Sequence, residues 1–251
     1  MSRNFELLHE AGKVQEMLRQ RMEAPAAAAP PAVLVPGTPA VHVEGPARDE
    51  LAKLVQRLFL AGSYRSRQVV FAGSERGNGS TWICAHTADV LASQLAGSVC
   101  VVDCDVLFPT LHQEFHVKND YGLAEALLGG EPIRQYVQQL SRPNLWLLSC
   151  GRMNETSQAL LTTETMRRRM NELRAEFDYV LLDVAPVNTS NHGAVLAGWC
   201  DGLTLVLKAN SSNRKVARQV LNDLQIANTP VLGAILNQRT FPVPEKIYSR
   251  L

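Results

Sequence analysis

Short apolar runs alternate with helical patterns along most of the chain. Six runs of aliphatic and β-branched residues predict strands, at 68–73, 98–103, 144–149, 179–183, 202–207 and 231–236. Nearly continuous hydrophobicity is typical of strands covered on both faces, which indicates a parallel sheet between helices. The segments between them predict helices over 50–62, 80–95, 122–139, 162–176, 190–199 and 213–226. The expected fold is therefore α/β, a doubly wound and mainly parallel sheet with right-handed crossovers.

The first 46 residues follow a different pattern. Apolar and charged residues recur at helical spacing over 1–20 and predict a short N-terminal helix. Residues 21–46 form a Pro/Ala-rich stretch, with six prolines and six alanines between positions 25 and 46, and this composition favours an extended linker. We therefore expect a tethered helix that serves as a docking element, and one domain over 47–251.

Composition and net charge limit the kinds of partner and the cellular compartment that we expect for this protein. With 25 Lys+Arg against 24 Asp+Glu, the net charge is 25 − 24 = +1, so bulk electrostatics gives no reason to expect a nucleic-acid partner. No apolar stretch approaches the ~18 residues of a membrane span. The five cysteines form no CxxC pair and lie mostly in apolar runs, which favours buried reduced thiols. We expect a cytoplasmic protein.

The candidate chemistry lies just after three of the predicted strands, because ligands bind at the carboxyl ends of strands in such a sheet. The first strand runs into the glycine-rich turn GSERGNGST and then a helix, the arrangement of a phosphate cradle. The second ends in Asp103 and Asp105, and the fourth in Asp183. Carboxylates at neighbouring strand ends would face the turn and could hold Mg²⁺ directly or through water.

A phosphate loop, a DxD motif about 24 residues later and a hydrophobic-DxxP motif about 80 residues further on resemble the Walker A, A′ and B motifs of the bacterial tyrosine kinase (BY-kinase) family. The segment LHQEFHVKNDYGLAEALLGG is also similar to that family, and the resemblance extends over 47–251. It implies a P-loop NTPase fold, ATP or ADP with Mg²⁺ as cofactors, and an inner-membrane polysaccharide co-polymerase that regulates chain length as partner. Glu50, Lys53 and Arg57 are similar to the helix that the family uses for self-association, which implies a homo-oligomer.

The resemblance also implies roles for individual residues. If the chain is active, Asp103, Asp105 and Asp183 would be catalytic. Thr81, Asp105 and Asp183 would hold Mg²⁺. The residues that would bind the nucleotide are Gly77, Asn78, Gly79, Ser80, Thr81 and Asn237. For Asn237, which follows the last strand, a simple turn residue is an equal alternative to a base contact.

The sequence departs from the family at three places. Ser80 stands where the loop GxxxxGK(S/T) has its lysine, and Glu75 stands where partitioning ATPases carry a second lysine, so Arg76 is the only cation of the loop. Val106–Phe108 replaces a segment in which the family usually has an arginine. The tail has one tyrosine, Tyr248, instead of a cluster, and we do not expect it to be a phosphorylation site.

Three functions remain open from the sequence. The first is a degenerate BY-kinase homologue that binds nucleotide weakly and regulates exopolysaccharide or capsule synthesis or export through a partner. The second is a working ATPase or tyrosine kinase in which Arg76, or a lysine from a neighbouring subunit, replaces the missing cation. The third and least favoured is a partitioning-type ATPase. Elsewhere, Arg167–Arg169 and Arg174 are expected to form a solvated basic face.

Overall fold

The computed structural model describes residues 43–61, 65–212 and 214–238. The predicted N-terminal helix over 1–20, nearly all of the predicted linker over 21–46, and Tyr248 lie outside these residues. The described residues all belong to one unit, Ala32–Leu251, so the sheet and the candidate site lie within it.

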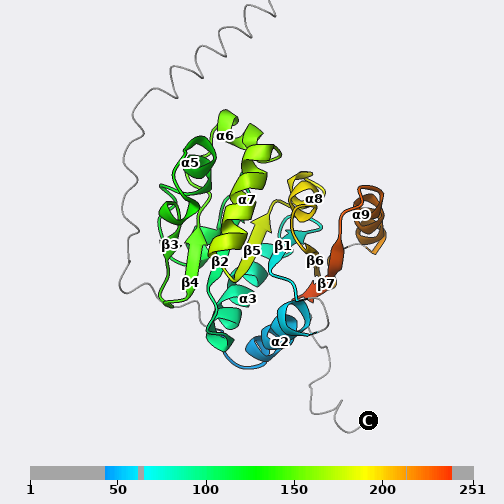
Figure 1. Cartoon of the computed structure of the whole chain (residues 1–251). Coiled ribbons are helices and arrows are strands. Elements are labelled where there is room, and N and C mark those ends of the chain that lie inside the picture. The colour runs from blue at the N-terminus through cyan, green and yellow to red at the C-terminus, as the bar shows by residue number, and fades with distance from the viewer. Residues whose placement is uncertain (1–42, 62–64, 213, 239–251) are drawn as a thin grey trace, which may run out of the picture. The chain divides into compact units, whose positions relative to one another are not determined.

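A seven-stranded sheet forms the centre of the unit, with strand order β3-β4-β2-β5-β1-β6-β7 (Figure 1). Its strands are β1 Gln68–Gly73, β2 Val99–Cys104, β3 Gln138–Gln139, β4 Leu145–Leu148, β5 Tyr179–Val184, β6 Gly202–Lys208 and β7 Val231–Asn237. All neighbours pair in parallel except β3, which is antiparallel to β4. All six predicted strands are present. The prediction missed β3 because two glutamines carry no apolar signal.

Helices cover both faces of the sheet (Figure 1). On one face, α2 Pro46–Val55, its π-helical extension η1 Gln56–Leu60 and α3 Ser80–Gln94 pack on one apolar cluster. On the other face a second cluster lies beneath α5 Leu123–Leu128, α6 Glu155–Leu160, α7 Glu164–Glu176, α8 His192–Ala197 and α9 Arg214–Ile226. Two short helical turns complete the set, α4 Leu111–Glu114 and the 3-10 turn η2 Ile133–Gln135. The predicted doubly wound α/β fold is confirmed.

The helix predicted over 122–139 is wrong in its second half. Helix α5 ends at Leu128, and the chain continues through Gly129, Gly130 and Pro132 into η2 and β3. Glycine favours a helix end and proline cannot continue one, so these residues outweigh the apolar periodicity that suggested a longer helix.

The end of α5 is held by Arg169, which corrects the expectation of a solvated basic face. The Arg169 side chain is 2% exposed. It donates to the backbone oxygens of Ala126, Gly129 and Glu131, each at 2.8 Å, and forms an ion pair with Glu172 at 2.6 Å. The guanidinium therefore satisfies carbonyl groups at the C-terminus of α5 and in the turn that follows it. Arg174 is also engaged, because it donates to Gln68 and Asp201, whereas Arg167 and Arg168 remain exposed.

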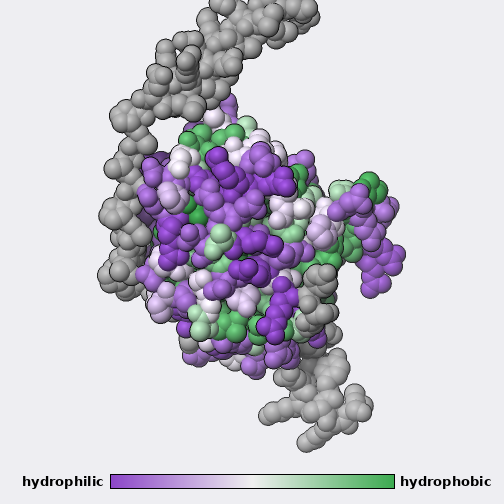
Figure 2. Space-filling view, in the orientation of Figure 1, coloured by the Kyte–Doolittle hydropathy of each residue, from purple (hydrophilic) through white to green (hydrophobic). Residues whose placement is uncertain are grey.

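Strand β7 forms one edge of the sheet, and its outer positions are largely uncovered by the described residues. Leu232 and Leu236 on this strand and Ile226 at the end of α9 are exposed, and Figure 2 shows apolar surface beside α9.

None of the described helices is long and apolar enough to cross a membrane. All five cysteines are free, as expected.

Candidate functional site

The glycine-rich turn connects β1 to α3 and is shaped by its glycines. Gly77 and Gly79 adopt φ angles of +83° and +82°, which strain any residue with a side chain. A Cβ atom at Gly73 would lie 2.9 Å from the backbone oxygen of Glu75. The turn can therefore curl back over the N-terminus of α3, where backbone N–H groups lack partners within the helix.

Two asparagines brace this turn from within the protein. The Asn78 side chain accepts a bond from the Glu75 N–H at 3.2 Å and donates to the Ser212 hydroxyl at 2.8 Å. The Asn237 side chain donates to the backbone oxygen of Asn78 at 2.9 Å. The structure thus brings both predicted cofactor-binding asparagines to the loop, but their side chains bond to protein groups there. Nothing in the sequence indicates the partnership of Asn78 with Ser212.

Ser80 and Thr81 form the first turn of α3 at the base of the loop. The Ser80 hydroxyl lies 3.6 Å from the position of a Cβ atom at Gly73, so this side chain points under the loop. The position that carries the lysine in a standard phosphate loop is therefore occupied by a short, uncharged group. Thr81 lines the cavity in front of the loop and lies beside Asp183.

Asp103 and Asp183 are opposite each other on the neighbouring strands β2 and β5, and both are buried. Burial raises the pKa of Asp103 to about 7, although the carboxylate accepts N–H bonds from Leu111 at 3.1 Å and Asp105 at 3.2 Å. Burial first, and then the charge of Asp103, raises the pKa of Asp183 well above its usual value. Neither oxygen of Asp183 accepts a well-formed hydrogen bond from a described residue, although the nearby Thr81 hydroxyl acts to lower its pKa. Among the described residues, no cation lowers the pKa of either carboxyl in the way that a loop lysine would.

This pair makes stability depend on pH. A carboxyl whose pKa is higher in the folded than in the unfolded state binds more protons when folded, so its stabilising contribution is present at low pH and is lost as pH rises. For Asp103 alone, we expect the free energy of unfolding to fall by on the order of 2–4 kcal/mol between about pH 4 and about pH 7.

Urea unfolding of the wild type and the Asp103→Asn variant at a series of pH values measures this contribution. The variant should lose less stability than the wild type between about pH 4 and about pH 7. This holds even if the substitution itself changes the free energy of unfolding by the same amount at every pH. Carboxyls with lowered pKa values, such as Asp178 and Asp201, change stability with pH in the opposite sense. Their contribution is the same in both proteins, so it cancels when the two plots of unfolding free energy against pH are compared. Equal slopes for the two proteins would contradict the assignment.

Asp105 shapes the turn after β2. Its Oδ1 accepts the N–H groups of Leu107 at 3.2 Å and Phe108 at 3.1 Å. Burial raises its pKa, while these two bonds and the positive charge of Arg76 act to lower it. Asp105 lines the same cavity as Thr81, whereas Asp183 is not among the residues that line it.

The cavity in front of the loop has a volume of about 170 Å³ and is lined by ten residues, among them Gly77, Gly79, Ser80, Thr81 and Asp105. Pockets for whole small-molecule ligands are typically about 300–1,000 Å³, so this cavity has room for phosphate groups but not for an entire nucleotide. In the described part of the chain, no three His, Cys, Asp or Glu side chains converge to hold a metal ion. A magnesium ion would fit here with Thr81, Asp105 and the phosphate oxygens of a nucleotide as ligands.

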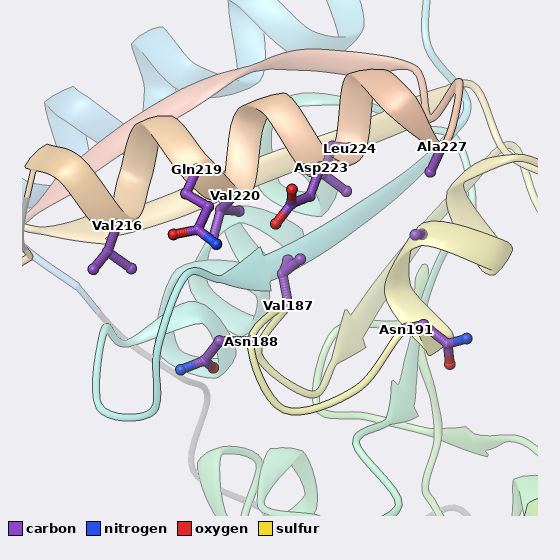
Figure 3. A pocket seen from close by; sticks show the side chains of 10 residues that line it. Val187, Asn188, Asn191, Val216, Gln219, Val220, Asp223, Leu224 and Ala227 are labelled. Atoms are coloured by element: carbon purple, nitrogen blue, oxygen red, sulfur yellow. The ribbon is translucent and has the colours of Figure 1, made fainter.

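A larger cavity of about 490 Å³ lies away from the loop, between α8, α9 and the segment that follows β5 (Figure 3). Val187 points toward Val220 and Leu224 of α9 across this cavity. Its polar lining consists of Asn188, Asn191, Gln219 and Asp223, with no cation or nucleophile among the lining side chains. We assign the candidate chemistry to the loop and the strand-end carboxylates instead.

The strand order, the glycine-rich loop before α3 and the carboxylates at the ends of β2 and β5 define a P-loop NTPase fold. Residues 67–227 match the family described as "Cellulose biosynthesis protein BcsQ". The chain belongs to this family.

Individual relatives include a protein named as a tyrosine-protein kinase and a protein named for polysaccharide transport. The tyrosine-protein kinase YwqD of Bacillus subtilis is 27% identical over 179 residues, which cover 71% of this chain and 75% of YwqD. The succinoglycan biosynthesis transport protein ExoP of Rhizobium meliloti is 28% identical over 190 residues, 74% of this chain and only 24% of ExoP. The crystal structure of the chimerical protein CapA2B2 shares the fold with a TM-score of 0.73 at 20% identity, over 79% of this chain and 87% of that one. The predicted relationship to the BY-kinases is confirmed.

Proposed function

We propose that this protein is a nucleotide-binding regulator of exopolysaccharide or capsule synthesis or export in which phosphoryl transfer is impaired. One observation carries the proposal. Ser80 occupies the lysine position of a phosphate loop whose glycines, Thr81 and strand-end carboxylates remain in place. The site keeps groups that hold a nucleotide and lacks the lysine beneath the loop that would stabilise charge on the phosphate being transferred.

The expected binding mode follows from the donors at the loop. Backbone N–H groups of the loop and of the first turn of α3 would bind the phosphates of ATP or ADP. The Thr81 hydroxyl and the Asp105 carboxylate would hold Mg²⁺, which neutralises phosphate charge when bound. Burial raises the pKa of both Asp103 and Asp183, which favours the protonated form of each carboxyl when no cation is near. If the site were active, these two and Asp105 would be its catalytic groups.

The proposed partner is an inner-membrane polysaccharide co-polymerase that controls chain length. The name of ExoP supports the link to polysaccharide export, and the relationship to tyrosine-protein kinases such as YwqD supports the link to its regulation. The protein would then act from the cytoplasmic side of the membrane. Self-association through α2 is part of the proposal, because Glu50 and Lys53 are exposed there, where they form an ion pair with each other at 2.6 Å.

Calorimetry with Mg·ADP and Mg·ATP, beside a γ-phosphate transfer assay, tests the proposal. We expect weak binding of both nucleotides and little or no transfer. A site with a dissociation constant of ~100 µM should also raise the melting temperature at several millimolar nucleotide. Thr81→Ala should weaken binding when Mg²⁺ is present, while Thr162→Ala, at an exposed threonine, serves as the matched control. Vigorous autophosphorylation, or the absence of any nucleotide effect, would contradict the proposal.

A further inference from the structure

Arg76 and Phe108 meet at the mouth of the cavity in front of the loop. The guanidinium carbon of Arg76 lies 3.4 Å from the centre of the Phe108 ring, which is close cation–π contact. Both residues line the cavity, and Phe108 is 54% exposed although it is a large apolar residue. The exposed ring therefore has a contact with a cation at a place where a phosphate group would bind.

Arg76 is the one cation among the side chains that line this cavity. Within the described residues it forms no ion pair, although its charge acts to lower the pKa of Asp105. The other charged groups at the cavity are the carboxylates of Glu75 and Asp105. The charge of Arg76 is thus available to an anionic ligand and is held at the rim by a ring.

The two possible contacts of Arg76 differ in strength. A cation–π contact at an exposed site corresponds to about a two- to fivefold effect on an equilibrium. A charge-assisted bond from arginine to a phosphate corresponds to roughly a tenfold to hundredfold effect. A terminal phosphate in the cavity would therefore outcompete the ring, and only the Arg76 side chain would have to rotate.

We propose that Phe108 is a positioning residue that holds Arg76 at the rim of the cavity, and that Arg76 moves from the ring to the terminal phosphate of a bound nucleotide. This inference rests on the proposed function, because it presupposes that the loop binds nucleotide. Arg76 would supply binding charge to the phosphate from the rim, whereas a lysine at position 80 would supply it from beneath the loop. The strength of the contact between Arg76 and Phe108 would determine how much nucleotide affinity is lost, because the arginine must leave the ring before it can bind the phosphate.

The inference predicts opposite effects for the two partners. Phe108→Ala removes the competing contact and should tighten Mg·ATP binding about two- to fivefold. Arg76→Ala removes the phosphate contact and should weaken binding roughly tenfold to a hundredfold. In the Arg76→Ala background, Phe108→Ala should have no further effect, because there is then no cation to hold. Leu107→Ala is the matched control, since Leu107 is also exposed and apolar and precedes Phe108.

Calorimetry with Mg·ATP on these four variants and the wild type gives the affinities. Side-chain NMR of the Arg76 guanidinium gives a second readout, independent of turnover. We expect a ring-current shift in the free wild type that disappears in Phe108→Ala and when Mg·ATP is added.

The outcomes separate this inference from the proposed function. If the wild type binds Mg·ATP and Arg76→Ala binds equally well, the inference is wrong and the proposed function stands. The inference is also wrong if Phe108→Ala changes the affinity equally with and without Arg76. The ring would then affect nucleotide binding by its own contacts and not through the arginine. If the wild type does not bind Mg·ATP, the proposed function fails and the inference fails with it.

Discussion

Replacing Ser80 by lysine is expected to raise the affinity for Mg·ATP roughly tenfold to a hundredfold, and any phosphoryl transfer by about 10²–10³-fold. The side chain at position 80 starts under the loop, near the bend at Gly73. A lysine there would place its charge within reach of phosphates bound in the cavity that position 80 lines. Transfer should gain more than binding, because charge develops on the phosphoryl group in the transition state and preorganised cations act mainly on that charge.

Calorimetry and a γ-phosphate transfer assay on Ser80→Lys measure the two gains. Ser80→Met is the matched control, since it adds a side chain of similar length without the charge, and it should gain neither affinity nor rate. If both variants behave like the wild type, the missing lysine is not what limits this site.

The second large effect concerns stability. Arg169→Ala is expected to lower the free energy of unfolding by about 3–5 kcal/mol. The substitution would leave three backbone carbonyls, those of Ala126, Gly129 and Glu131, without their donor, and would open a void where a buried side chain lay. Each buried polar group without a partner costs about 1–3 kcal/mol.

Urea or thermal unfolding measures this loss. Arg168→Ala is the matched control, because its side chain is 63% exposed and its loss should change stability by no more than about 0.5 kcal/mol. Arg169→Lys should recover only part of the stability, since one ammonium cannot reach all of the acceptors that the guanidinium fork reaches. Equal stability of the Arg169→Ala and Arg168→Ala variants would show that the buried network contributes little.

The strands of this protein could be predicted because their signal is local. A strand covered on both faces must be apolar over several residues in a row, as in β1 and β5, and the chain has few other segments of that kind. Where the signal was weaker, the prediction failed. The apolar periodicity of α5 continues past Leu128, and only the glycines and the proline beyond it mark its end.

The candidate site could be predicted in outline but not in its contacts. The sequence shows which residues end each strand, and the parallel sheet then brings Asp103, Asp183 and the loop to one edge. Contacts between distant segments left no such signal. Asn78 reaches Ser212, and Arg76 stacks on Phe108, through side-chain directions that depend on the finished fold. The burial of Arg169 was missed for the same reason. It follows Arg167 and Arg168, and a run of three arginines is typical of an exposed helix face.

The central sheet separates the apolar interior into two clusters, one beneath α2 and α3 and one beneath the five helices of the opposite face. The phosphate loop leads into α3, which packs on the first of these two clusters. The opposite face still reaches the loop at one point, because Asn78 donates to Ser212, which lies just before α9. A shift of α9 against the sheet would therefore change how Asn78 braces the loop, even though α9 and the loop lie over different apolar clusters.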